Sequence, residues 1–308
     1  MTAEALRAQG DAAHSSGSSI ELIIPYPQGG GTDQRSRLLA RHLAAELGEP
    51  VVPVNRTGAI VGHTAIAQAQ PDGRTLGMIT GEIGMMHWHR DLSALTWRDY
   101  VPLAVPYVEA AAVIVRADAP WTSLEQLLAA LRERPLTGSG GPDFGVWKFA
   151  MVGLMNRAGI GASQLRWMPT LSGEEGVANV IAGHADIAPI TMTDARAMIF
   201  GGQVRALATM EDRRHPMFPE VPTVAEAIGL PWRVAHWRGL VGPAGMPDAA
   251  RERIVRAARR IAADPAFDEE CRRNGYSLHW RFDRDFADYM VQDDRQFGEV
   301  IALLEGVA

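Results

Sequence analysis

A repeated order of secondary-structure signals constrains the fold of this chain more than any single motif. From Ile20 onward an apolar run is followed by a turn and then by a helical pattern, and this order occurs several times. Residues 20–25 predict a buried strand, and the helix that follows presents four leucines on one face before Gly48 ends it. Strand–helix–strand order predicts a parallel sheet with helices on its faces, so we expect an α/β protein.

The pattern starts again near residue 110, which predicts a second α/β unit of similar size. Short apolar strands again alternate with helical segments, until a last strand near residues 234–241 leads into two charged helices. Open α/β sheets bind ligands at the carboxyl ends of their strands, and clefts between domains are favoured ligand sites. We therefore expect two lobes with a ligand cleft between them.

The expected domain organisation follows from these two units. Residues 1–19 are small and polar and predict a flexible N-terminal segment. Lobe 1 is expected to comprise residues 20–108 and 241–308, and lobe 2 residues 109–240. Residues 1–19 lack the apolar stretch of a secretory signal, so from these residues we expect either a cytoplasmic protein or one whose leader has been removed or replaced.

Charge and residue usage exclude several classes of function. The net charge of −6 argues against a nucleic-acid partner. Lys148 is the only lysine, so chemistry that needs an ammonium group has one candidate. Cys271 is the only cysteine, which excludes a disulfide within the chain and a cysteine-rich zinc site. No apolar run approaches the roughly 20 residues of a membrane span.

Two glycine-rich loops are the candidate ligand-binding motifs. The first, at residues 26–33, lies between a predicted strand and a predicted helix, where Thr32 or Asp33 could cap the helix. Glycines allow a ligand to approach the backbone closely, and amides at a helix N-terminus attract anions. The second loop, around residues 138–141, also precedes a helix. Each loop could instead be a simple turn.

Known catalytic and nucleotide-binding motifs do not fit these loops. Gln34 occupies the last glycine position of a dinucleotide-binding fingerprint, and no Gly-Lys pair forms a phosphate loop. Thr137 replaces the first glycine of a nucleophile elbow. His87 and His89 alternate on a predicted strand without a nearby third metal ligand. We therefore expect no enzyme activity, no cofactor and no metal, although an enzyme using the same cleft stays open as an alternative.

Taken together, the motifs resemble the periplasmic solute-binding receptors of tripartite tricarboxylate transporters. The resemblance runs from about residue 20 to the C-terminus, with the pieces in the family's order and spacing. The segments that carry it are residues 25–30 with Asp33, residues 55–58, 71–73, 113–116, 120–121 and 222–226, and residues 237–240 with 243–247.

This resemblance implies a two-lobed periplasmic-binding-protein fold of the Venus-flytrap, type II-like class, with two crossing strands. It implies capture of a small organic carboxylate in the cleft and its delivery to membrane permease subunits, in the periplasm, by a monomeric receptor. A sensory receptor that presents its ligand to a signalling partner remains an alternative. The ligand contacts that it implies are Tyr26, Gln28, Gly29, Gly30, Gly31, Thr80, Gly81, Ser139, Gly140, Gly141, Thr170, Ser172, Gly173 and Thr191.

Several positions depart from the family pattern and bear on the ligand. Ile60 and Val61 lie in a shortened loop, which predicts a more apolar pocket. Ile190 stands where amino-acid-binding members tend to have aspartate, and Trp147 stands where a histidine is usual. Thr170 replaces a frequent tyrosine. These departures favour an apolar or aromatic carboxylate.

Overall fold

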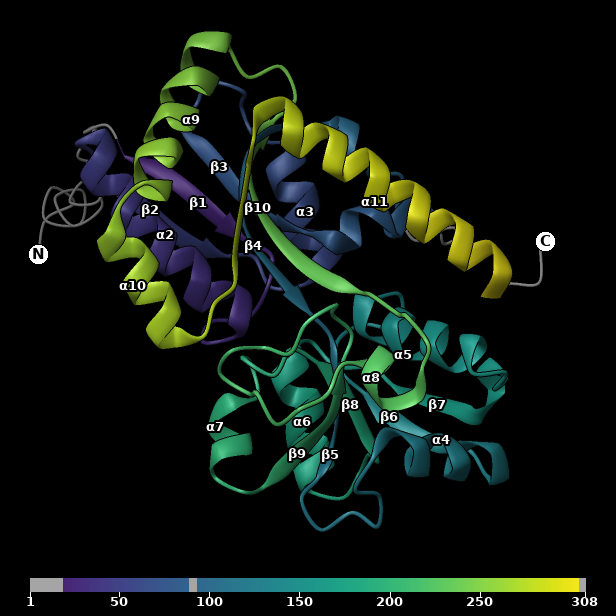
Figure 1. Cartoon of the computed structure of the whole chain (residues 1–308). Helices are drawn as coiled ribbons and strands as arrows, with labels where there is room; N and C mark the ends of the chain where they lie inside the picture. Colours follow the sequence, from purple (N-terminus) through teal and green to yellow (C-terminus); the bar gives the residue numbers. More distant parts are fainter. Residues whose placement is uncertain (1–18, 89–92, 305–308) are drawn as a thin grey trace, which may run out of the picture.

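The computed structural model describes residues 19–88 and 93–304 and has two α/β lobes joined by crossing strands (Figure 1). The expected flexible segment at residues 1–19 lies outside the described residues except for Ser19. No helix within the described ranges is long and apolar enough to cross a membrane.

Lobe 1 is built on a six-stranded mixed sheet with the strand order β11-β4-β10-β3-β1-β2. Its strands are β1 (Ile20–Ile24), β2 (Val51–Asn55), β3 (Thr75–Thr80), β4 (Tyr100–Ala110), β10 (Ala235–Pro243) and β11 (Leu278–Phe282). Its helices are α2 (Gly31–Leu47), α3 (Ala59–Ala67), α9 (Asp248–Ala262), α10 (Pro265–Asn274) and α11 (Asp283–Leu304), with short 3₁₀ turns η1 (Gly81–Gly84), η2 (Met86–Trp88) and η3 (Trp97–Asp99). β1 lies between β2 and β3 and is parallel to both, as the strand–helix–strand order predicts.

Lobe 2 is built on a five-stranded sheet with the order β7-β6-β8-β5-β9. Its strands are β5 (Ala112–Arg116), β6 (Leu136–Ser139), β7 (Leu165–Met168), β8 (Ile187–Ile190) and β9 (Val204–Thr209). Its helices are α4 (Leu124–Glu133), α5 (Val146–Arg157), α6 (Gly173–Ile181), α7 (Arg196–Phe200) and α8 (Val224–Ile228), with the turn η4 (Ala162–Gln164). One apolar cluster fills this lobe.

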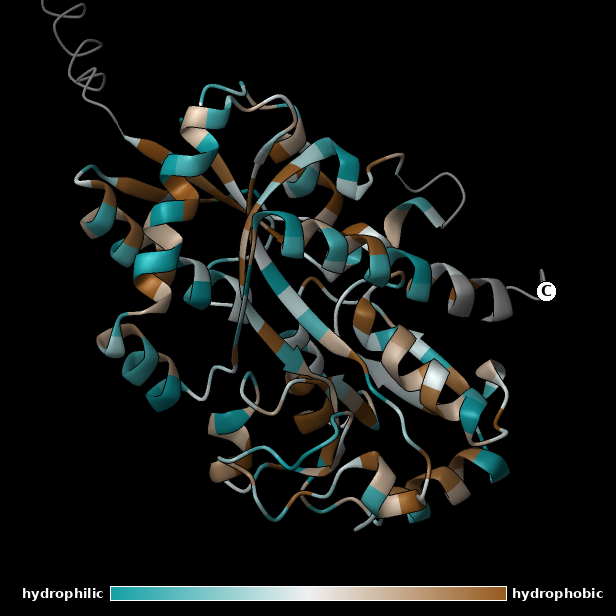
Figure 2. Ribbon diagram, turned by 45° about the horizontal axis from the view of Figure 1, so that its top comes forward, coloured by the Kyte–Doolittle hydropathy of each residue, from teal (hydrophilic) through white to brown (hydrophobic). Residues whose placement is uncertain are grey.

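Apolar side chains cover both faces of the lobe 1 sheet. Leu22 packs with α2, α9 and α10 on one face, whereas Ile23 packs with α3 and α11 on the other. Figure 2 shows the consequence: hydrophobic colour lies along the strands, and α9, α10 and α11 alternate between hydrophobic and hydrophilic colour.

The two crossings between the lobes are short and lie side by side. β4 passes through Ala111 into β5, and Ala111 donates a backbone hydrogen bond to Val234 at 2.9 Å, just before β10 begins. β10 pairs with β4 from Ala235 onward. The expected boundary at residue 240 therefore falls inside β10, because the whole of that strand is hydrogen-bonded in the lobe 1 sheet.

Helix α11 extends from lobe 1 across to lobe 2 (Figure 1). Near its start Phe286 packs in the lobe 1 core, and near its end Phe297 packs in the lobe 2 core, 4.7 Å from the Phe149 ring. Residues 283–304 thus contact both lobes, whereas the sequence assigned them to lobe 1 alone.

Asp293 connects α11 to the crossing strand β10. Its Oδ2 accepts a hydrogen bond from Trp237 Nε1 at 2.6 Å. Burial, together with the negative charges of Glu82 and Asp294, raises the pKa of Asp293 to about 8. In the folded protein the Asp293 carboxyl is therefore mostly protonated, and so uncharged, at neutral pH.

This pKa predicts a pH-dependent effect of Asp293→Asn. Because the folded pKa is above the unfolded value, the stabilisation linked to proton binding is complete at acid pH and is lost as the pH rises through about 8. We expect the variant to melt higher than wild type by about 2 °C or more near about pH 9, and to gain less near about pH 5. Thermal melts at both values test this, with the exposed Asp288→Asn on the same helix as control. An equal shift at both pH values would contradict it.

Candidate functional site

The candidate site is the cleft between the lobes, close to both crossing strands. The cavity that remains in it has a volume of only about 30 Å³, enough for no more than a few water molecules. The lobes are therefore closed on each other. The residues that line the cleft are Tyr26, Gly30, Gly31, Thr32, Glu82, Gly141, Pro142, Trp147, Leu171, Ser172, Gly173, Glu174, Asp194, His236 and Arg238.

Lobe 1 contributes the loop between β1 and the N-terminus of α2. The helix begins at Gly31, and Gly30 caps it in an extended conformation without any side-chain hydrogen bond. The expected capping by Thr32 or Asp33 is thus wrong in detail, because the helix begins before either residue. Asp33 instead accepts a hydrogen bond from the Gly29 amide at 2.8 Å, which holds the loop in place and leaves the Gly31 amide facing the cleft.

Lobe 2 contributes the loop after β6 and the N-terminus of α6. The Gly141 amide donates to Thr170 Oγ1 at 2.7 Å, and Gly141 has a φ of 83°, a conformation that favours glycine. Ser172 caps α6 through its side chain. The N-termini of α2 and α6 therefore meet at the same cleft.

A carboxylate of the protein lies between these two helix ends. Glu174, in the first turn of α6, accepts a hydrogen bond from the Gly31 amide at 2.5 Å. Burial and the neighbouring Asp194 raise the pKa of Glu174 above its ordinary value. Helix N-termini attract anions because their amides are unpaired and the helix dipole is positive there. The cleft thus already holds one carboxylate at a position suited to an anion.

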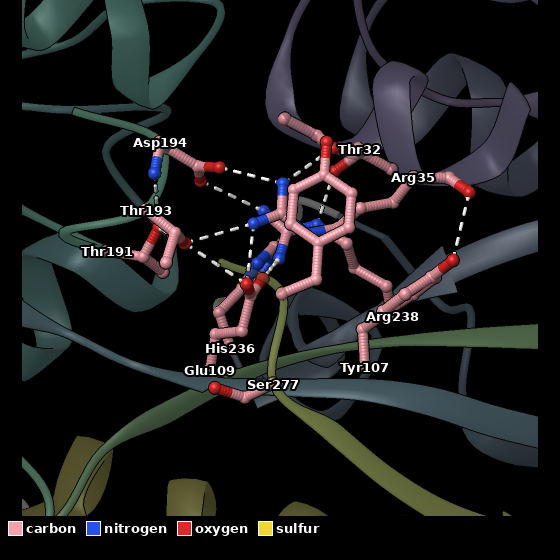
Figure 3. Close-up of polar contacts among 12 residues, drawn as sticks. Thr32, Arg35, Tyr107, Glu109, Thr191, Thr193, Asp194, His236, Arg238 and Ser277 are labelled. Carbon is pink, nitrogen blue, oxygen red and sulfur yellow. Dashed lines mark hydrogen bonds and ion pairs between the residues drawn. The ribbon is translucent and has the colours of Figure 1, made fainter. Parts of the chain in front are cut away.

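Four buried charges form a ring across the cleft, which we call the interlobe ring (Figure 3). Arg35 contacts Glu109 at 2.6 Å and Asp194 at 2.8 Å. Arg238 contacts Glu109 at 2.6 Å and Asp194 at 3.1 Å. The four side chains are between 1% and 6% exposed. Two positive and two negative charges balance, and each group touches both of its opposites.

The interlobe ring spans both lobes. Arg35 comes from α2, Glu109 and Arg238 from the crossing strands, and Asp194 from the segment after β8 in lobe 2. Although burial opposes ionisation of Asp194, the two arginines hold its pKa well below the usual range. These ion pairs join the two lobes in this arrangement, because Asp194 comes from lobe 2 and Arg35 from helix α2 of lobe 1.

A second buried pair lies beside the ring. His236 Nε2 is 3.0 Å from Glu82 Oε2, and both side chains are almost fully buried. Although burial opposes ionisation of Glu82, His236 lowers the pKa of that carboxyl to about 2. His236 Nδ1 has no hydrogen-bond partner among the described residues, and the His236 ring lies 4.9 Å from that of Trp147.

The structure brings some of the sequence-predicted residues to the cleft and places others behind it. The cleft is lined by Tyr26, Gly30, Gly31, Gly141, Ser172 and Gly173. Three others lie elsewhere on the lobe surfaces or in a neighbouring pocket, namely Gln28, Gly29 and Thr170. The remaining predicted residues, buried and outside the cleft lining, are Thr80, Gly81, Ser139, Gly140 and Thr191.

The hydrogen bonds of three of these residues explain their positions. Thr80 bonds to the Tyr26 hydroxyl at 3.2 Å and so supports the cleft from behind. Ser139 Oγ donates to the Met168 carbonyl and accepts from Asn179, both within lobe 2. Thr191 Oγ1 accepts from the Asp194 amide at 3.1 Å and thereby orients a member of the interlobe ring.

Sequence reasoning predicted none of the acidic, basic or histidine side chains that line the cleft. Glu82 and Glu174 directly follow two predicted positions, Gly81 and Gly173, so one more residue toward the C-terminus in each case would have included them. Arg238 and His236 lie within the last strand that the sequence predicts, near residues 234–241, but nothing in that pattern marks them as cleft residues. Asp194 gives no local signal, because only the fold brings it to the arginines.

Comparison with known proteins matches this architecture. Residues 36–305 match the model of the tripartite tricarboxylate transporter family receptor. A protein of Pseudomonas sp. (strain P51), encoded in the tcbD–tcbE intergenic region, is 31% identical over 89% of this chain and 82% of its own. Protein BugT of Bordetella pertussis is 29% identical over 73% of this chain and 71% of its own.

Solved structures share the fold at low sequence identity. The periplasmic binding protein BugD superposes with a TM-score of 0.85 at 21% identity, covering 93% of this chain and 97% of that one. MatC from Rhodopseudomonas palustris with bound malate gives a TM-score of 0.83 at 20% identity, covering 92% and 98%. A further R. palustris protein with adipate gives 0.86 at 21% identity, covering 94% and 97%.

These findings confirm the two-lobed fold and the family resemblance. The family is one of solute-binding receptors rather than of enzymes, and in the described ranges no group of three or more metal-ligating side chains could hold a metal ion. The chain belongs to the tripartite tricarboxylate transporter family of solute receptors.

Proposed function

We propose that this receptor captures a small carboxylate in the cleft and delivers it, in the periplasm, to the membrane permease subunits of a tripartite transporter. The observation that carries this proposal is the carboxylate of Glu174 held at the facing N-termini of α2 and α6. A ligand carboxylate would take that place when the lobes open and close again. The malate and adipate bound by two structural relatives support the ligand class.

Fixed backbone amides, rather than free cations, would hold the ligand carboxylate. Arg35 and Arg238 line or adjoin the cleft, but each is already paired with two carboxylates in the interlobe ring. Lys148, the only lysine, pairs with Asp143 at 2.8 Å outside the cleft lining. Hydrogen bonds from amides to a charged acceptor are stronger than those to a neutral acceptor. The backbone amides at the N-termini of α2 and α6 would therefore be sufficient to bind a carboxylate.

An apolar pocket next to the cleft favours a ligand with an apolar or aromatic body. It has a volume of about 210 Å³ and shares Tyr26, Pro142 and Leu171 with the cleft. Ile60 and Val61, from the shortened loop, are among the residues that line it. Apolar surface that leaves water on binding stabilises the complex.

A thermal-shift screen of aliphatic and aromatic carboxylates tests the proposal. A ligand that binds only the folded protein raises the free energy of unfolding, by about 2.7 kcal/mol at a ligand concentration of one hundred times its Kd. The melting temperature rises accordingly. We expect a subset of acids to raise the melting temperature and isothermal titration to give one site per chain. A flat screen across monocarboxylates, dicarboxylates and aromatic acids would overturn the proposal. Association with the permease subunits can then be followed with the ligand that binds.

Glu174→Gln is expected to strengthen carboxylate binding. The glutamine can still accept from Gly31 but no longer repels the incoming carboxylate, so we expect about tenfold tighter binding at neutral pH, or roughly 1.4 kcal/mol. Because the pKa of Glu174 is raised, acidification protonates it, and the advantage over wild type should shrink as the pH falls toward that pKa. Glu175→Gln, exposed on the same helical turn, is the matched control. Weaker binding by Glu174→Gln would show that Glu174 itself holds the ligand.

Asp194→Asn is expected to weaken binding by about tenfold or more. The substitution leaves two buried arginines with one carboxylate, and this excess charge disfavours the closed state. Titration calorimetry measures the affinity, and small-angle scattering should show a larger radius for the ligand-saturated variant. The exposed Asp212→Asn, which removes only a surface ion pair with Arg233, should bind as wild type does. Wild-type affinity in Asp194→Asn would contradict a role for the ring in closure.

A further inference from the structure

The ionisable groups of the cleft that do not belong to the interlobe ring bear on the choice of ligand. Because the ring balances two arginines against Glu109 and Asp194, it offers no spare positive charge to a ligand. The other ionisable groups in the lining are Glu82, Glu174 and His236, apart from the Tyr26 hydroxyl. Two of these three are acids.

A ligand carboxylate can replace Glu174 at the helix ends, but Glu82 stays. Glu82 lies in η1, is 2% exposed, and is held in place by its contact with His236. The groups that surround this pair are the Tyr26 hydroxyl, Thr80 and His63 behind it, Asp293 of α11, and Arg238, which belongs to the ring and shares the cleft lining. Burial lowers the pKa of His63, so that this histidine is neutral and does not offset the charge of Glu82.

The unpartnered nitrogen of His236 is the group that remains for a ligand. The Glu82 carboxylate accepts a hydrogen bond from His236 Nε2–H at 3.0 Å, and in that tautomer of the imidazole Nδ1 carries the lone pair. That nitrogen is buried and has no partner among the described residues, in a side chain that lines the cleft. An unsatisfied buried acceptor costs free energy that a ligand donor would recover.

We infer that the cleft selects monocarboxylates that carry a hydrogen-bond donor, a hydroxyl, amide or ammonium group, at the end away from the carboxylate, and that His236 Nδ1 accepts from this donor. This inference rests on the proposed function and adds the chemistry of the ligand's second end. A second carboxylate at that end would have to bring a proton to Nδ1 and would lie near the Glu82 charge. Dicarboxylates are therefore disfavoured by this particular chain.

The test compares acids that share a carbon frame and differ only at the distal group. Suitable sets are γ-hydroxybutyrate, succinate and butyrate; ε-aminocaproate, adipate and hexanoate; and para-hydroxybenzoate, terephthalate and para-toluate. Titration calorimetry with wild type at neutral pH should show, in the frame that binds best, the donor acid binding at least about tenfold tighter than the dicarboxylate, which is about 1.4 kcal/mol.

Two variants test whether the preference for donor acids depends on the His236–Glu82 pair. In His236→Phe the donor acid should lose its advantage over the methyl analogue, while the exposed His184→Phe keeps it. In Glu82→Gln the dicarboxylate should gain about tenfold relative to the donor acid, because the repelling charge is removed. Melting curves confirm that each variant is folded, and the wild-type ratios decide the question even if one variant does not fold.

The outcomes separate this inference from the proposal on which it rests. If dicarboxylates bind wild type as tightly as donor acids, or if His236→Phe leaves the ratios unchanged, the selectivity is overturned while carboxylate capture stands. If no acid of any frame binds, both fall.

Discussion

The closed structure depends on the interlobe ring of Arg35, Glu109, Arg238 and Asp194. Burying four charges is costly unless each is paired, and here each one contacts two of opposite sign. The ring joins helix α2, both crossing strands and the segment after β8. It therefore connects the two lobes beside the crossing strands.

The ring also explains how an acidic cleft can receive an acid. Its arginines are fully engaged, so the positive potential available to a ligand comes from the helix N-termini at Gly31 and Gly173. Glu174 occupies that potential in the closed structure, which has room for little else. Ligand capture then becomes an exchange of one carboxylate for another, with the distal end of the ligand facing His236 and Glu82.

Helix α11 adds a contact between the lobes on another part of the molecule. Phe286 and Met290 pack in the core of lobe 1, and Phe297 and Ile301 pack in that of lobe 2. Asp293, between them, bonds to Trp237 of β10, one strand residue away from both His236 and Arg238. Strand β10 thus contacts α11 through Trp237 and contributes His236 and Arg238 to the cleft.

Local sequence patterns were sufficient for the alternating strands and helices and for the two glycine loops, because apolar periodicity and helix ends are encoded by neighbouring residues. They did not predict β4, since Pro102 and Pro106 argue against an internal strand; the structure accommodates them where the register of β4 with β10 shifts. Nor could they join Arg35 to Asp194, which are 159 positions apart. The sequence by itself determined the lobes and the loops that meet at the cleft. Only the tertiary structure decided which charges cancel there, because pairing of buried charges depends on distance in space and not along the chain.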